Sequence, residues 1–149
     1  MSGAVRKRLG ETAELVEEQH DRRAAAMQER LRRLLTLAGE ERALDVGTGA
    51  GAFAIALAPL VREVIGVDVR TELLDEGRTR APGNVELVEA DVTALPYELG
   101  SFDLVCTALA LHHAPRPELV LAEMNRVLRP GGSMLVVDCE PPSSSNVCR

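Results

Sequence analysis

"ALDVGTGAGAFAIAL", residues 43–57, runs from a short apolar stretch through three alternate glycines into an alanine-rich stretch. The apolar stretch predicts a buried strand, and the alanine-rich part predicts a short helix that ends at about Ala58. Glycines at the junction allow a sharp turn and let the backbone approach a ligand without a Cβ in the way. A glycine-rich turn between a strand and a helix is typical of a site for a nucleotide-like ligand.

The chain on either side continues this alternation of strands and helices. Strands are predicted at 42–46, 62–69, 85–90, 102–110 and 133–138. Helices are predicted at 71–80 and 117–128, and "RPGG" at 129–132 predicts a turn. Alternating strands and helices form right-handed βαβ units, so we expect an α/β fold with a parallel sheet and helices on both faces.

Two flanking segments differ from this core. Residues 11–38 have the apolar spacing of one or two amphipathic helices, with Gly39 as a helix stop, and they define an N-terminal helical segment, 1–40. These helices are expected to cover the sheet, and closure over a ligand stays open as a second role. The core spans 41–139, and the Pro- and Ser-rich end, 140–149, predicts a disordered tail.

Composition and charge bound the class of protein. A chain of 149 residues with 46% hydrophobic residues fits one globular domain. Its net charge of −6 argues against binding the phosphate backbone of a nucleic acid, which needs a basic face. No segment approaches 18 apolar residues and no signal peptide is recognisable, so we expect no membrane span and a cytoplasmic location.

The three cysteines, Cys106, Cys139 and Cys148, have no C-x-x-C spacing. We therefore expect neither a disulfide framework nor a metal site. Cys106 lies in an apolar run and is predicted to be an inert thiol in the core.

Acidic residues at the strand ends narrow the choice of ligand. The glycine pattern is G-x-G-x-G, and Asp45 precedes it by two residues. A carboxylate there would repel a pyrophosphate but could hold a positively charged ligand, directly or through water. Asp68, at the carboxyl end of the second strand, can accept hydrogen bonds from both hydroxyls of a ribose, a feature that NAD sites share. Asp91 can accept from an adenine amino group, although Asp-Val-Thr is also a good turn or helix N-cap.

Four segments carry a family resemblance: "LDVGTGAG" (44–51), "VIGVD" (64–68), "VEADVTALPY…SFDLV" (88–105) and "ALHHAPRPELVLAEMNRVLRPGGSMLVVD" (110–138). Together they resemble class I S-adenosylmethionine-dependent methyltransferases, in the group that includes ubiquinone- and menaquinone-biosynthesis-type enzymes. The resemblance implies a Rossmann-like, doubly wound parallel sheet of order 3-2-1-4-5. It also implies S-adenosyl-L-methionine as the cofactor and methyl transfer to a small-molecule acceptor. An NAD-dependent oxidoreductase would explain Asp68 but neither Asp45 nor "RVLRPGG".

The resemblance further implies roles for single residues. Asp68 would hold the ribose hydroxyls with Val69 against the adenine, and Asp91 and Val92 would meet the adenine edge. The residues expected at the methionine portion and its backbone cradle are Asp45, Gly47, Thr48, Gly49, Gly51, Thr107 and Ala108. Arg126 and Arg129 are expected to be surface or packing residues.

His112 and His113 follow the fourth strand, where substrate and cofactor meet in open α/β sheets. They are the candidate catalytic residues, because a neutral imidazole there could take a proton from a phenol or a carbon acid. Alternatively, one histidine caps the loop and the other is solvated.

The sequence departs from the family after the fifth strand. Members of the family usually continue through another helix and two more strands, which this chain lacks. A cofactor-binding but catalytically incomplete domain is therefore the alternative function. An apolar fifth strand with an unpaired edge is a template for pairing, so we also predict self-association through it.

Overall fold

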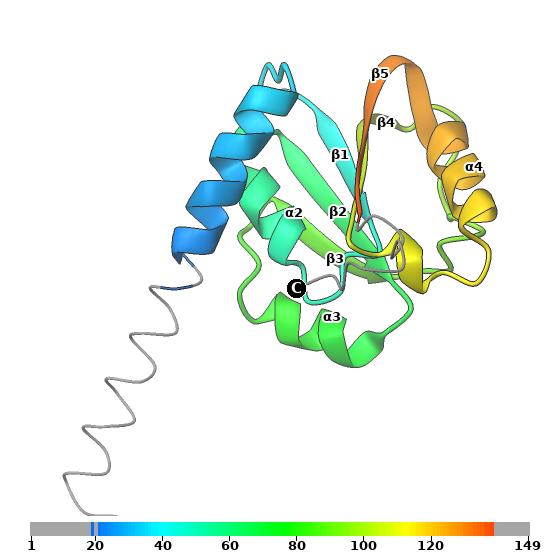
Figure 1. Ribbon diagram of the computed structural model, residues 1–149, viewed down its shortest axis with the longest axis horizontal. Helices are drawn as coiled ribbons and strands as arrows, with labels where there is room; N and C mark the ends of the chain where they lie inside the picture. The colour runs from blue at the N-terminus through cyan, green and yellow to red at the C-terminus, as the bar shows by residue number, and fades with distance from the viewer. Residues whose placement is uncertain (1–18, 20, 139–149) are drawn as a thin grey trace, which may run out of the picture.

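The computed structural model describes residue 19 and residues 21–138, and these form one parallel sheet with helices on both sides (Figure 1). The strands are β1 (Arg42–Val46), β2 (Glu63–Asp68), β3 (Val85–Glu89), β4 (Phe102–Ala108) and β5 (Leu128–Val137). All pairs are parallel, and the order is β3-β2-β1-β4-β5. The predicted α/β class and strand order are confirmed.

Helices cover both faces of the sheet, each over its own apolar layer. A helix over 21–34, α2 (Ala52–Leu57) and α3 (Thr71–Arg78) pack on one face, where Leu31, Phe53 and Leu74 join one buried cluster. On the other face α4 (Pro117–Val127) contributes Val120, Met124 and Val127 to a second cluster. Two short 3-10 helices, η1 (Ala58–Leu60) and η2 (Leu111–His113), complete the described elements. This two-layer burial is what alternating strands and helices produce.

Cys106 lies within the first of these clusters. Its side chain is fully buried, and burial raises the pKa of its thiol. The prediction of an inert core thiol is confirmed.

The N-terminal helix is shorter than predicted at its carboxyl end. It ends at residue 34, before Gly39, and the chain then turns around the Glu41 carboxylate, which accepts hydrogen bonds from the Ala38 and Gly39 amides. Leu31 in the helix is buried against the sheet, which confirms the covering role. Residues 1–18 and 139–149 lie outside the described part, so the predicted segment bounds and the tail stay predictions.

The fifth strand begins five residues earlier than predicted. The prediction of a turn at 129–132 is wrong, because these residues belong to β5. Leu128 pairs with Phe102 and Ser133 pairs with Leu104, so four residues lie opposite Asp103 as an irregularity in the strand. A Cβ on Gly132 would lie 2.8 Å from the Asp103 carbonyl oxygen, so a glycine permits this close approach. The bulge depends on contacts with β4, which sequence periodicity does not report.

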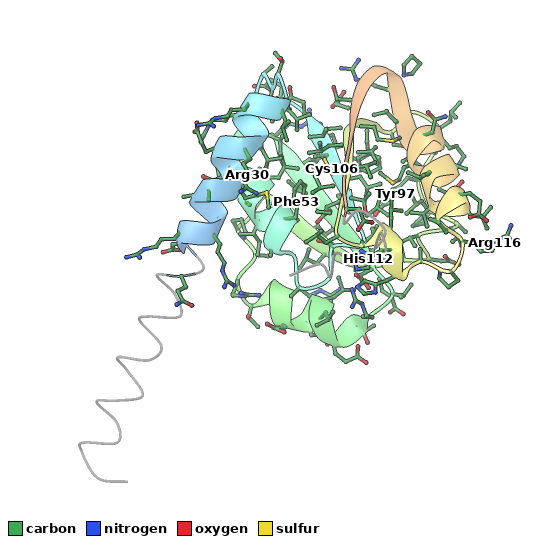
Figure 2. All side chains as sticks on the ribbon, viewed as in Figure 1. Arg30, Phe53, Tyr97, Cys106, His112 and Arg116 are labelled. Atoms are coloured by element: carbon green, nitrogen blue, oxygen red, sulfur yellow. The ribbon has the colours of Figure 1, made fainter. Side chains whose placement is uncertain are left out.

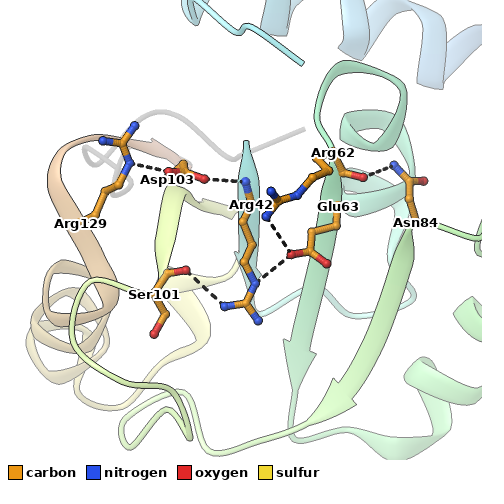
Figure 3. Close-up of polar contacts among 7 residues, drawn as sticks. All are labelled: Arg42, Arg62, Glu63, Asn84, Ser101, Asp103 and Arg129. Carbon is orange, nitrogen blue, oxygen red and sulfur yellow. Dashed lines mark hydrogen bonds and ion pairs between the residues drawn. The ribbon is translucent and has the colours of Figure 1, made fainter. Parts of the chain in front are cut away.

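Polar contacts tie the strands together near their amino ends (Figure 3). Arg42 donates from its backbone to Asp103 Oδ2 at 2.8 Å, and its guanidinium reaches the Ser101 carbonyl and the Glu63 carboxylate. Arg129 of β5 donates to the same Asp103. The contacts link β1 to both neighbouring strands and β4 to β5. At the opposite, carboxyl edge of the sheet, the groups available to a ligand come from the strand ends and the connecting loops.

Strand β5 is at the edge of the described sheet and pairs there with β4 alone. Val136 and Val137 near its end are 44% and 36% exposed. Self-association through this edge stays a prediction, which sedimentation at increasing protein concentration would test. Among the described helices, none is long and apolar enough to cross a membrane.

Substitution of Gly77 by alanine should destabilise the fold. A Cβ at Gly77 in α3 would lie 2.5 Å from the Ala50 carbonyl oxygen and 2.6 Å from a methyl of Leu87. Helix propensity alone would favour alanine by about 1 kcal/mol. The clash outweighs this gain, and we expect the free energy of unfolding to fall by about 1–3 kcal/mol in urea titrations. Gly83→Ala is the control, because nothing lies within 4 Å of the added atom; equal effects of the two substitutions would contradict the prediction.

Candidate functional site

A cavity of about 410 Å³ opens at the carboxyl edge of the sheet. Its walls come from the segments that follow four of the strands, as expected for an open parallel sheet. The residues lining it are Val46 and Gly47 at the end of β1, Asp68, Val69 and Arg70 at the end of β2, Val92 and Thr93 after β3, and Thr107, Ala110, Leu111, His113, Ala114, Pro115, Arg116 and Val120 from β4 to α4.

The glycine turn forms the floor of this region. Gly47, Gly49 and Gly51 have φ angles of 75°, 57° and 79°, in the left-handed region that favours glycine. The amides of Gly47 and Thr48 both donate to the Val67 carbonyl oxygen at 2.9 Å, which fixes the turn against β2. A Cβ on Gly47 would lie only 2.5 Å from Ala110 Cβ, so the turn also packs against the loop after β4.

Asp45 is buried beneath the turn. Its Oδ2 accepts a 2.7 Å hydrogen bond from the Thr48 hydroxyl, and its Oδ1 has no hydrogen-bond partner within the described part of the chain. Burial raises the pKa of Asp45 to about 6, against the lowering effects of Thr48 and of the nearby Ala54 amide, which lies outside hydrogen-bond geometry. The negative charge of Asp68 raises this pKa further. A cation near this carboxylate would relieve both costs.

Asp68 is the last residue of β2 and lines the cavity, although it is only 3% exposed. Its Oδ2 accepts from the Gly49 amide at 2.8 Å, and its Oδ1 accepts from the Arg70 amide at 3.0 Å. The Arg70 guanidinium adds two more hydrogen bonds, one to each oxygen, both at 3.1 Å. Burial alone would raise the pKa of Asp68, but the bonds from Arg70 and Gly49 outweigh it and hold this pKa below its usual range. Asp68 is therefore an ionised acceptor at neutral pH.

The segment after β3 meets the cavity only in part. Val92 and Thr93 line it, whereas Asp91 is exposed and is not among the lining residues. Both the amide and the hydroxyl of Thr93 donate to Asp91 Oδ1, at 2.8 and 2.6 Å. Asp91 thus forms the turn that the sequence offered as its second interpretation, and its contact with an adenine stays a prediction.

The end of β4 carries a second unpaired polar atom. Thr107 is 1% exposed and lines the cavity, and within the described residues its hydroxyl oxygen has no hydrogen-bond partner. Two residues later Leu109 has a φ of 54°, unusual for a side chain of this kind, and its amide donates to the Val137 carbonyl oxygen at 2.7 Å. Strained backbone of this type is common at functional sites.

The two candidate catalytic histidines have different surroundings in the structure. His113 lines the cavity. His112 contacts Asp138 after β5 instead: its Nδ1 lies 2.6 Å from Oδ1, and its amide donates to Oδ2 at 3.0 Å. The two rings are 3.9 Å apart between centroids. In the described part of the chain, no cluster of three or more His, Cys, Asp or Glu side chains is placed to hold a metal ion.

Sequence reasoning missed Arg70 and Gly66. Arg70 follows Asp68 by two residues, and at the start of a helix this spacing lets the guanidinium reach the Asp68 carboxylate. The spacing was a signal in the sequence that could have indicated this ion pair. Gly66 lies in the middle of β2, where a Cβ would be 2.6 Å from the Thr48 hydroxyl. An isolated glycine within a strand pattern signals such a close approach.

Replacing Asp45 by asparagine should change how stability depends on pH. The folded-state pKa of about 6 exceeds the ordinary aspartate value of 3.8, so the folded protein binds more protons than the unfolded chain between about pH 4 and pH 6. Wild-type stability from this group is therefore lost as pH rises through that window. Asparagine does not titrate, so the free energy of unfolding of Asp45→Asn relative to wild type should increase by up to about 3 kcal/mol between pH 4 and pH 7. Urea titrations at several pH values measure this; parallel pH profiles would contradict it, and the exposed Asp75→Asn is the control.

Comparison with known proteins agrees with the geometry. A family described as methyltransferase domain matches residues 44–136. Demethylmenaquinone methyltransferase of Staphylococcus aureus is 39% identical over 107 residues, which are 68% of this chain and 44% of the relative. The chain therefore spans less than half the length of this curated relative.

Solved structures show the same architecture. An S-adenosylmethionine dependent methyltransferase from Mesorhizobium loti matches with a TM-score of 0.64 and 29% identity, over 72% of this chain and 51% of that one. Phosphoethanolamine N-methyltransferase 1 of Haemonchus contortus, in complex with phosphoethanolamine and S-adenosylhomocysteine, matches with a TM-score of 0.69 and 25% identity, over 83% and 28%. Since the family match covers more than half of the chain, the chain belongs to the methyltransferase domain family.

Proposed function

We propose that the chain binds S-adenosyl-L-methionine in the cavity at the carboxyl edge and transfers its methyl group to a small-molecule acceptor. The observation that carries the proposal is the Asp68 carboxylate, held ionised at the cavity wall against the amide of Gly49 in the glycine turn. This acceptor suits a vicinal diol such as that of a ribose. Family membership supports methyl transfer as the reaction.

The remaining polar and apolar groups fit the cofactor. Val69, which follows β2, and Val92, which follows β3, supply apolar walls of the cavity for an adenine. Gly47, Gly49 and Gly51 carry no side chains that would block the approach of a ligand to the backbone of the turn. Thr48 holds the Asp45 carboxylate below the turn. The unpaired Thr107 hydroxyl and the buried Asp45 would meet the amino-acid portion, whose ammonium and sulfonium are cationic. Asp91 would contribute through the turn that it forms beside Val92.

The chain's own residues have a limited task in this reaction. The bound cofactor supplies a methyl group already activated by its positive sulfur. Asp68 and the glycine turn hold one reactant in place, and the loop from β4 to α4 provides a surface for the other. Holding the two in line is an effect of proximity and orientation that can lower the barrier by several kcal/mol.

The acceptor side of the cavity favours an apolar molecule. Leu111, Ala114, Pro115 and Val120 line it. Arg116 extends outward and pairs with Glu118, so its charge is already matched (Figure 2). We therefore place an aromatic or quinol-like acceptor, the kind named for the Staphylococcus aureus relative, ahead of an amine such as phosphoethanolamine. A cytoplasmic location and the absence of nucleic-acid partners stay predictions.

His113 is the candidate base for an acceptor that must lose a proton. It lines the cavity, while His112 is occupied by Asp138. Once an acceptor is found by product formation across a panel of phenols, quinols, thiols and amines, His113→Ala should lower kcat by about 10²- to 10⁴-fold for a phenol or carbon acid. The affinity for S-adenosylhomocysteine should stay within about twofold. An unchanged kcat in the double substitution of His112 and His113 by alanine would remove base catalysis from the proposal.

Calorimetric titration tests the cofactor directly. We expect binding of S-adenosylmethionine and S-adenosylhomocysteine and none of NAD, because the buried Asp45 disfavours a pyrophosphate near the turn. Asp68→Asn should weaken S-adenosylhomocysteine at least about tenfold, since a charge-assisted bond contributes about 1.5–3 kcal/mol. Asp75→Asn, on the exposed face of α3, is the matched control. Binding of NAD in preference to S-adenosylhomocysteine would overturn the proposed cofactor, and binding without product from any acceptor would favour a domain that only binds it.

A further inference from the structure

The Asp68 carboxylate already has four hydrogen-bond donors. Two are backbone amides, those of Gly49 and Arg70. The other two are Nε and Nη2 of the Arg70 guanidinium, which bind Oδ1 and Oδ2 respectively, each at 3.1 Å. A carboxylate offers about four acceptor positions, so all of them are in use.

The two guanidinium bonds face the cavity. Arg70 is one of the lining residues, and its side chain is 54% exposed, whereas that of Asp68 is 4% exposed. The two backbone bonds belong to the glycine turn and to the start of α3, so they stay wherever those elements stay. Only the Arg70 side chain can leave Asp68 without a change in the fold.

A ribose diol matches what the guanidinium provides. Two neighbouring hydroxyls donate two hydrogen bonds to the two oxygens of one carboxylate, as the two N–H groups of Arg70 do. Both cannot occupy the same acceptor positions at once. We propose that the Arg70 side chain is a built-in competitor for the ribose of the cofactor, and that it leaves Asp68 when the cofactor binds. This inference rests on the proposed function.

The surroundings explain why a competitor is present. Asp68 is nearly buried and its charge raises the pKa of buried Asp45, so without the Arg70 side chain the ligand-free site would hold an Asp68 carboxylate with no neutralising charge and only two backbone donors. The guanidinium neutralises Asp68 until a ligand replaces it. Once released, it remains in the field of Glu72 in the first turn of α3, a charge that already raises the pKa of Arg70. After the exchange, Arg70 would have Glu72 as its compensating charge, and Asp68 would have the hydroxyls of the ligand as donors.

Removing the guanidinium should strengthen cofactor binding. Arg70→Met keeps the aliphatic stem and deletes the two donors, and titration at pH 8 keeps Asp68 ionised. We expect S-adenosylhomocysteine to bind about 2- to 5-fold more tightly than to wild type, the range for loss of a competing half-exposed ion pair. Arg80→Met removes the exposed pair with Glu76 beyond α3 and should leave the affinity unchanged. Equal or weaker binding by Arg70→Met would overturn the inference.

A second measurement follows Arg70 in the wild-type protein, so it does not depend on a variant that folds. The Nε–H resonance of Arg70, assigned by its absence in Arg70→Met, should move on addition of S-adenosylhomocysteine towards the position of a solvated arginine and exchange faster with water. A resonance that stays unchanged at saturation would show that Arg70 remains on Asp68 and would overturn the inference alone. Failure of wild type and both variants to bind S-adenosylhomocysteine would instead overturn the proposed function, and the inference with it.

Discussion

The close approach of the turn after β1 to strand β2 positions the two carboxylates of the site, Asp45 and Asp68. Two amides of the turn share one acceptor, the Val67 carbonyl oxygen, and a third, that of Gly49, binds Asp68. The approach is possible because Gly66 has no Cβ beneath the Thr48 hydroxyl. That hydroxyl in turn holds Asp45. A larger residue at position 66 would therefore displace both carboxylates through one contact.

The two carboxylates are kept in opposite states by their surroundings. Burial raises the pKa of Asp45 to about 6, while hydrogen bonds from Arg70 and Gly49 keep the pKa of Asp68 low. The site thus has one carboxylate that is fully compensated without a ligand and one that is not. This difference gives a cationic ligand a favourable position near Asp45 and requires an exchange of partners at Asp68.

Most strand bounds could be predicted from sequence, because each strand is a short apolar run bounded by turn residues, whereas the order of the strands followed from the family resemblance. The start of β5 could not, since "RPGG" has turn chemistry and only the pairing of Leu128 with Phe102 makes it part of a strand. In the site, Asp45, Asp68 and the glycines were found because their chemistry follows from strand ends. The separation of His112 from His113 depends on Asp138, which lies 26 residues further along the chain, so no local pattern reports it. Asp91, in contrast, forms the local turn with Thr93 that the sequence offered as an alternative to its contact with an adenine.

The polar contacts around Arg42 and Asp103 lie at the amino edge of the sheet, and the cavity lies at the carboxyl edge. The length of the strands separates these two regions, and the strand residues between them, such as Leu44 and Val105, are apolar and buried. Residues at the amino edge therefore hold the strands together without lining the cavity. In this fold, heat resistance and choice of substrate can be tuned as independent traits.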